Sequence, residues 1–140
     1  MKSVFMLAVC GSIAVGSLLA QTAFGVESFK KEFEAKYVKK DPTTDAEKSL
    51  AAAVTKTKCN VCHVGKTKKV RNEYGKALDE LLDKKTDAKN IPKIQEALDK
   101  VAGMKSDPKD PNSPTFGQLI VQGKLPGGEE PAAPAAAAAE

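Results

Sequence analysis

The residues with the clearest chemistry lie in one short run, Cys59-Asn60-Val61-Cys62-His63. This Cys-x-x-Cys-His spacing is the attachment motif of a c-type haem. Two thiols three positions apart can form thioethers with the two vinyl groups of one porphyrin, and the adjacent imidazole then reaches the iron. We therefore expect Cys59 and Cys62 to bind one haem c covalently, with His63 as the proximal ligand of the haem iron.

Two other kinds of site use a Cys-x-x-Cys pair. A thioredoxin-like dithiol lies near a βαβ unit, but the sequence around Cys59 lacks the alternating apolar pattern of strands. A structural zinc site needs four ligands, usually Cys or His. Beyond residue 25 the sequence offers only Cys59, Cys62 and His63 of these types, so a carboxylate would have to be the fourth ligand. Both alternatives fit the sequence less well than haem attachment.

The first 25 residues have the pattern of a secretory signal peptide. Lys2 provides a positive start, residues 4–20 are mainly apolar, and Ala23-Phe24-Gly25 is a small-x-small cleavage site. The mature chain would begin near residue 26, in the periplasm or otherwise outside the cytoplasm. Because the apolar stretch is short for a span of roughly 20 residues, we expect a soluble exported protein with no stable membrane span after signal removal.

The remaining chain has the length of one domain. Removing residues 1–25 from the 140-residue chain takes away Lys2 and no acidic residue, so the formal charge falls from +4 to +3. The lysines are dispersed and no aromatic residues alternate with them, which argues against nucleic-acid binding. We expect a haem domain over residues 26–125. Residues 126–140 are rich in Gly, Pro, Glu and Ala, which predicts a flexible tail.

Hydrophobic periodicity and capping residues predict an all-α domain. The expected helices run from residue 28 to 39, from the capping box at Thr44 to about Thr57, from Asn72 to Lys85, from Asn90 to Gly103, and from Thr115 to Gly123. Residues 64–71 are expected to form a basic loop, and the three Pro residues between 105 and 114 predict a second, turn-rich loop.

The motif and the helix order resemble those of a class I monohaem cytochrome c over residues 44–125, because a helix leads directly into Cys-x-x-Cys-His. The string CNVCHVGKTKKVRNEYGKAL is also similar to small monohaem cytochromes of planctomycete-type bacteria. The resemblance implies helices wrapped around one covalently attached haem, and a protein that carries single electrons and is not an enzyme. The chain departs from the family in lacking a glycine-aromatic pair just before Cys59 and in the long proline-rich stretch after residue 104.

The second axial ligand of the iron is less well defined by the sequence. Met104 is the one methionine beyond the expected signal and lies 41 residues after His63. The class I resemblance makes it a possible distal ligand of the haem iron, and the same position also suits a core residue that fills a gap. Without Met104 the sixth position would be open, or held by Lys, Tyr74 or Asn72.

Basic residues cluster around the motif in the sequence. They are Lys56, Lys58, Lys66, Lys68, Lys69 and Arg71. Such a cluster could guide the protein to acidic patches on redox partner proteins, or it could be a solvated face only. Two alternatives to an electron carrier remain: an open-site haem protein that binds a small gas or peroxide, and a haem subunit of a larger redox complex.

Overall fold

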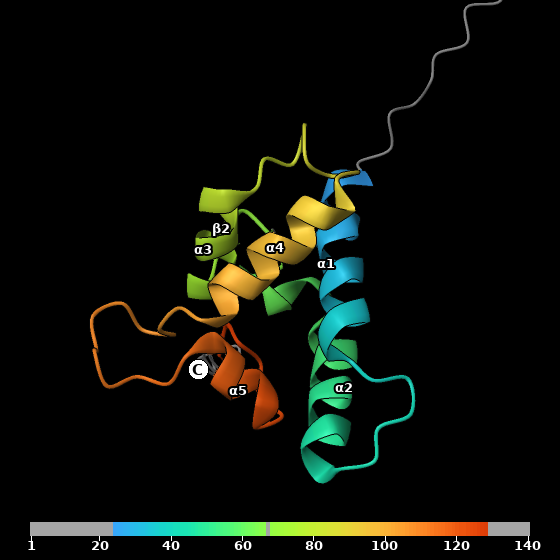
Figure 1. The fold of residues 1–140 in the computed structure, drawn as a ribbon, viewed down its shortest axis with the longest axis vertical. Coiled ribbons are helices and arrows are strands. Elements are labelled where there is room, and N and C mark those ends of the chain that lie inside the picture. The colour runs from blue at the N-terminus through green and yellow to red at the C-terminus, as the bar shows by residue number, and fades with distance from the viewer. Residues whose placement is uncertain (1–23, 67, 129–140) are drawn as a thin grey trace, which may run out of the picture.

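A computed structural model describes residues 24–66 and 68–128 of the chain. Its elements in chain order are α1 (Phe24–Tyr37), α2 (Asp45–Thr57), the 3-10 helix η1 (Lys58–Val61), β1 (His63–Val64), β2 (Val70–Arg71), α3 (Glu73–Leu81), α4 (Ile91–Ala102) and α5 (Phe116–Val121). Figure 1 shows α4 running diagonally between α1 and α3, with α2 and α5 at the other end of the molecule. The described part of the chain is therefore mostly helical.

One element corrects the all-α expectation. His63 and the expected basic loop after it form a short antiparallel hairpin, in which His63 pairs with Arg71 and Val64 with Val70. Each strand has only two residues, so the sequence carries no alternation that would predict it. Gly65, at φ 73°, helps to turn the chain between the strands. The hairpin begins at the histidine of the motif and therefore orients it.

The predicted capping residues of α2, α3 and α5 are confirmed, and Asn90, after which the next helix was expected, caps α4. Each side chain accepts a hydrogen bond from a main-chain N–H in the first turn of its helix; these residues are Thr44, Asn72, Asn90 and Thr115. Two boundaries differ from the prediction by more than two residues. Helix α1 begins at Phe24, before the expected Ser28. Helix α3 ends at Leu81, because the Asp87 carboxylate accepts the N–H of Asp83 at 2.9 Å and thereby stabilises a turn.

Both predicted terminal segments lie largely outside the described residues. The signal peptide falls on residues 1–25, of which 24 and 25 are described, and the tail on 126–140, of which 126–128 are described. Packing continues past the expected boundary at residue 125, since Pro126 is fully buried. Within the described ranges, no helix is long and apolar enough to cross a membrane.

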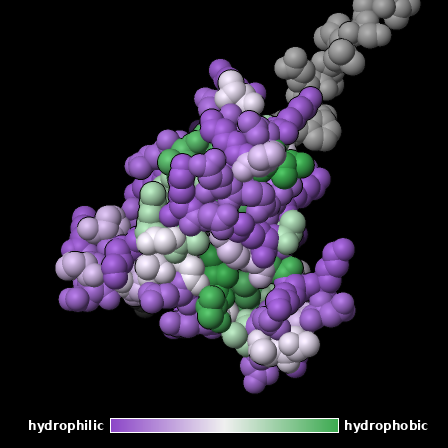
Figure 2. Space-filling view, in the orientation of Figure 1, coloured by the Kyte–Doolittle hydropathy of each residue, from purple (hydrophilic) through white to green (hydrophobic). Residues whose placement is uncertain are grey.

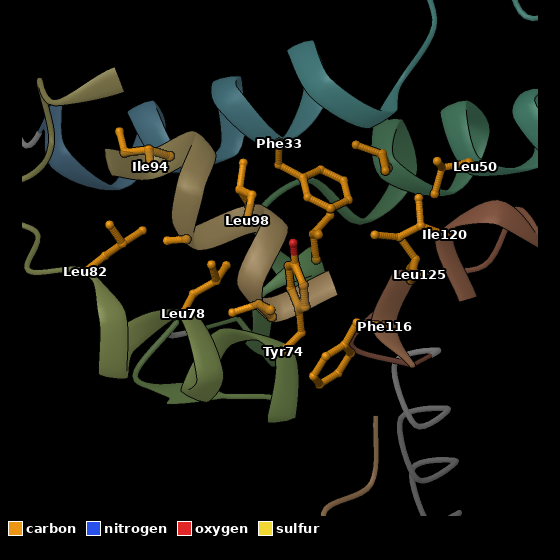
Figure 3. Close-up of a cluster of buried hydrophobic side chains, with 14 residues drawn as sticks. Phe33, Leu50, Tyr74, Leu78, Leu82, Ile94, Leu98, Phe116, Ile120 and Leu125 are labelled. Atoms are coloured by element: carbon orange, nitrogen blue, oxygen red, sulfur yellow. The ribbon is translucent and has the colours of Figure 1, made fainter. Parts of the chain in front are cut away.

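The core gathers the predicted inward faces of the helices. Ile94, Leu98 and Val101 of α4 are fully buried at its centre. Figure 3 shows Tyr74 of α3 between Phe33 of α1 and Phe116 of α5, and both ring pairs pack edge to face at centroid distances of 5.8 and 5.2 Å. Figure 2 shows a mainly hydrophilic face with a small apolar area among α2, α4 and α5. The aromatic contacts join α1 to the rest of the domain.

Glu47, in the first turn of α2, makes the stability of the fold depend on pH in a way that can be tested. The Glu47 carboxylate accepts the N–H groups of Thr44 and Thr43 and pairs with Lys39, which lowers the pKa of Glu47 to about 2. A lowered folded-state pKa stabilises the fold above the ordinary value of 4.5 and loses this effect as the pH falls toward 2. In urea unfolding, we expect Glu47→Gln to be less stable than the wild type at pH 7 and nearly equal to it at pH 2. An unchanged difference between the two pH values would contradict this prediction.

Candidate functional site

The chain enters the Cys-x-x-Cys-His motif through a sharp turn at the end of α2. Lys58 has φ 52° and ψ −109°, a conformation that L-residues rarely adopt, and its N–H donates to the carbonyl of Val54. Cys59 follows within η1, and the N–H of Cys62 donates to the carbonyl of Cys59 at 3.2 Å. The two cysteines are therefore held at the two ends of one tight turn.

Asn72 fixes this turn to the start of α3. Its side-chain nitrogen donates to the carbonyls of Val61 at 3.0 Å and Asn60 at 3.3 Å, while its side-chain oxygen accepts the N–H of Gly75 at 2.9 Å. The main-chain N–H of Asn72 also donates to the carbonyl of Cys62 at 3.2 Å. One side chain thus caps α3 and holds the motif at the same time.

Because Asn72 has both roles, Asn72→Asp is expected to cost more stability than the same substitution at Asn90. Asn72→Asp keeps the capping oxygen but replaces the donor to Val61 and Asn60 by an oxygen, so two carbonyls lose their partner. We expect a loss of about 1 kcal/mol in unfolding free energy, the lower end of the cost of unsatisfied buried groups, because both hydrogen bonds are only partly buried. Asn90→Asp is the matched control, because Asn90 caps α4 through its oxygen alone in the described bonds. Equal unfolding free energies for the two variants, measured in urea, would exclude the proposed clamp.

Helix α3 approaches the motif closely at Gly75. A β-carbon at this position would overlap the carbonyl oxygen of Cys62 and lie 2.9 Å from its carbonyl carbon. The chain near its C-terminus packs on the same region, because a β-carbon at Gly127 would overlap the side chain of Asn72. The backbone of α3 therefore lies directly against the motif, and the backbone at Gly127 lies against the Asn72 side chain that holds the motif.

Cys59, Cys62 and His63 line one cavity of about 570 Å³. Its volume lies in the range of about 300–1,000 Å³ that is usual for bound ligands and cofactors. Val61, which is buried, lies on the same wall. The three residues expected to bind the haem are thus brought together at one hollow.

The rest of the cavity is built from two helices that are distant in sequence. From α1 come Phe29 and Phe33 with Glu27 and Lys30. From α3 and the turn after it come Gly75, Leu78, Asp79, Leu82 and Lys84. Aromatic and aliphatic side chains thus provide the interior, and charged side chains stand beside them.

A second, more polar cavity of about 410 Å³ adjoins the first. The two share Arg71, Asp79, Leu82 and Lys84 as lining residues. Arg71 pairs with Asp79 at 2.7 Å. The apolar hollow at the motif therefore continues into a charged one, with Arg71 and Asp79 at the boundary between them.

Burial controls the protonation of the motif. Desolvation, followed by the effect of Cys59, raises the pKa of the Cys62 thiol to about 12. Desolvation and then the nearby charge of Arg71 lower the pKa of His63, which favours the neutral imidazole that binds metals. The Nδ1 atom of His63 is buried and, among the described residues, has no hydrogen-bond partner. Cys62 is thus a protonated thiol, and His63 favours its neutral ring.

Met104 and the predicted basic residues differ in whether they line the cavity at the motif. Met104 follows α4, is 39 % exposed and is not one of the residues that line the cavity. Of the six basic residues near the motif, Lys58, Lys68 and Arg71 line the cavity, while Lys56, Lys66 and Lys69 are exposed. Sequence reasoning assigned no site role to Lys30, Phe33 or Leu78, and only their helical periodicity marked the two apolar residues as buried.

The structure also bears on the two alternative uses of the cysteines. In the described part of the chain, no three His, Cys, Asp or Glu side chains gather in a way that would hold a metal ion. The thiols of Cys59 and Cys62 are free, and the sheet of the described residues is a two-stranded antiparallel hairpin. A raised thiol pKa is the reverse of what a reactive dithiol requires. The described residues thus contain neither a ready-made cluster of metal ligands nor a βαβ unit beside the cysteines.

Comparisons of the chain with protein-family models, with curated proteins and with solved structures find no match.

Proposed function

We propose that this protein is an exported c-type cytochrome that binds one haem through Cys59 and Cys62 and carries single electrons between redox partners. The observation that carries the proposal is that both thiols and the His63 imidazole line one apolar cavity of cofactor size. A haem bound there would supply an iron that accepts and releases one electron.

The chain's own residues suit this role in three ways. Cys59 and Cys62 offer two sulfur atoms from one turn, and Asn72 holds that turn on α3. Phe33 and Leu78, both buried, supply apolar side chains to the cavity lining, and burial is one of the properties that set the reduction potential of a haem. Lys84, which lines both cavities, would be available to pair with a carboxylate that a haem carries.

The basic residues around the motif supply a surface for partners. Lys58 and Lys68 line the cavity. Lys56, Lys66 and Lys69 are exposed and lie close to the motif in the sequence. A positive surface near the site of electron exchange would speed encounters with acidic partners at low ionic strength. Stopped-flow measurement of electron exchange with an acidic partner would then show rates that fall with added salt.

Covalent haem content is the direct test. Produced with its signal in a bacterium that matures c-type cytochromes, the wild type is expected to keep its haem after denaturation and acid extraction. Cys59→Ser and Cys62→Ser are each expected to lower that content, and the double variant to abolish it. Cys10→Ser is the control, because this third cysteine lies in the expected signal peptide. The proposal would be refuted if the wild-type protein were isolated without haem and carried zinc or a Cys59–Cys62 disulfide instead.

A further inference from the structure

The chain that follows α5 forms a strap, residues 123–127, which packs back onto the domain. Gly123 starts the strap at φ 77°, a value that favours glycine, and a β-carbon there would overlap the carbonyl oxygen of Ala46 in the first turn of α2. Leu125 and Pro126 follow and are both buried, Leu125 as a member of the hydrophobic core. The strap is therefore anchored on α2 and in the core, although its last residues were expected to belong to a tail.

The strap ends against the side chain of Asn72. The N–H of Gly128 donates to the carbonyl of Leu125 at 3.1 Å and closes a turn that contains Gly127. A β-carbon at Gly127 would overlap the side-chain nitrogen of Asn72. This nitrogen is the atom that donates to two carbonyls of the attachment motif. The absence of a side chain at Gly127 thus leaves the room in which the Asn72 amide lies.

The contacts of the Asn72 amide leave it one orientation. Its oxygen accepts the N–H of Gly75 at 2.9 Å, and its nitrogen points to the motif and touches the backbone of Gly127. A group that displaced the nitrogen from the side of the strap would therefore also take it away from the motif carbonyls. Those carbonyls lie between Cys59 and Cys62, so the displacement would reach the turn that carries both thiols.

We infer that Gly127 is a positioning residue for haem attachment, because the strap keeps the Asn72 amide on the motif and the motif then presents both thiols together. This inference rests on the proposed haem attachment and adds a residue distant in sequence to the same site. In each attachment a thiol adds across a vinyl C=C bond: one C–S bond forms, the thiol hydrogen goes to the terminal carbon, and nothing is oxidised or reduced. Two additions to one porphyrin need both sulfur atoms in place, so a relaxed turn favours a product with a single thioether.

Counting the thioethers of the haem-loaded protein tests the inference. The denatured protein is treated with a thiol-alkylating reagent, and the haem peptide that contains the motif is analysed by mass spectrometry. A product with two thioethers has no motif cysteine left to alkylate. We expect Gly127→Ala and Asn72→Ala each to raise the singly attached fraction several-fold over the wild type. Gly127→Ala should add nothing to Asn72→Ala, because the new β-carbon then has no amide to displace.

Gly117→Ala is the matched control, since it also crowds a glycine but at a different contact. A β-carbon at Gly117 in α5 would lie 2.9 Å from the carbonyl oxygen of Ala102 at the end of α4. This substitution is expected to lower stability by overpacking while the singly attached fraction stays at the wild-type value. A general loss of stability is thereby separated from an effect on the motif.

Urea unfolding gives a second readout that does not require haem. The variant with both Asn72→Ala and Gly127→Ala should unfold at no lower urea concentration than Asn72→Ala alone. The inference is overturned if Gly127→Ala leaves the singly attached fraction unchanged, if Gly117→Ala raises it equally, or if Gly127→Ala destabilises Asn72→Ala as much as it does the wild type. Absence of covalent haem from the wild type would refute the proposed function, and the urea comparison would still show whether Gly127 acts on Asn72.

Discussion

Gly75→Ala is expected to destabilise the protein by about 3 kcal/mol or more, at the upper end of the usual cost of overpacking. The added β-carbon would overlap the Cys62 carbonyl oxygen. This oxygen belongs to the backbone and accepts the N–H of Asn72, so it cannot rotate away as a flexible side chain would. Either α3 or the attachment turn has to move. Urea unfolding followed by circular dichroism measures the loss.

Gly103→Ala is the matched control for this prediction. Gly103 has an ordinary αR conformation at the end of α4, and a β-carbon there would lie 3.5 Å from the carbonyl oxygen of Lys100, a normal contact. We expect its unfolding free energy to remain within about 0.5 kcal/mol of the wild type, as is usual for a substitution free of strain. If Gly75→Ala were as mild as Gly103→Ala, the close approach of α3 to Cys62 would be wrong. A displaced turn should also lower the yield of covalent haem.

Loss of the haem is expected to have the second large effect. The double variant Cys59→Ser with Cys62→Ser should be less stable than the haem-loaded wild type by at least about 3 kcal/mol, comparable to deleting a large core side chain. The reason is the cavity of about 570 Å³ bordered by Phe33, Val61 and Leu78. Without a ligand, these side chains lose contacts on one side. Urea unfolding of both proteins at pH 7 gives the comparison.

The serine substitutions need a control of their own. Wild type produced without export, and therefore without haem, should unfold at nearly the same urea concentration as the double variant, because both leave the cavity unfilled. A difference between these two haem-free proteins would assign part of the loss to the serines. Equal stability of the haem-loaded and haem-free wild type would show that the cavity is not a haem pocket.

The unfolding free energy gained by binding the proposed haem would compensate for features of the chain that cost stability. Among the described residues, the buried Tyr74 hydroxyl and the Nδ1 atom of His63 lack a hydrogen-bond partner, and Lys58 and Lys68 adopt positive φ values of 52° and 55°. Buried unsatisfied groups and left-handed conformations each cost about 1–3 kcal/mol. Lys58, His63 and Lys68 lie in or next to the motif and its hairpin. Tyr74 lies at the start of α3, which packs on the motif. Such local strain is expected where a backbone is shaped around a bound group.

Local structure was predicted well because it depends on neighbours in the sequence. The capping box at Thr44 and Glu47 requires residues three positions apart, and the buried face of α4 follows from residues spaced at one helical turn. The motif is also local, since Cys59, Cys62 and His63 occupy five consecutive positions. The sequence by itself therefore determined where most helices begin, and it singled out the residues to which the proposed chemistry is assigned.

Only the tertiary structure decided what surrounds those residues. The cavity combines side chains from α1, the motif and α3, from Glu27 to Lys84, and no periodicity within one helix can indicate which other helix it will face. The structure also placed Met104 outside the cavity lining, gave Gly75 its contact with Cys62, and formed the hairpin from strands of two residues. Each of these features arises from contacts between segments distant in sequence, whose free energy depends on the whole packed arrangement and not on any single stretch of chain.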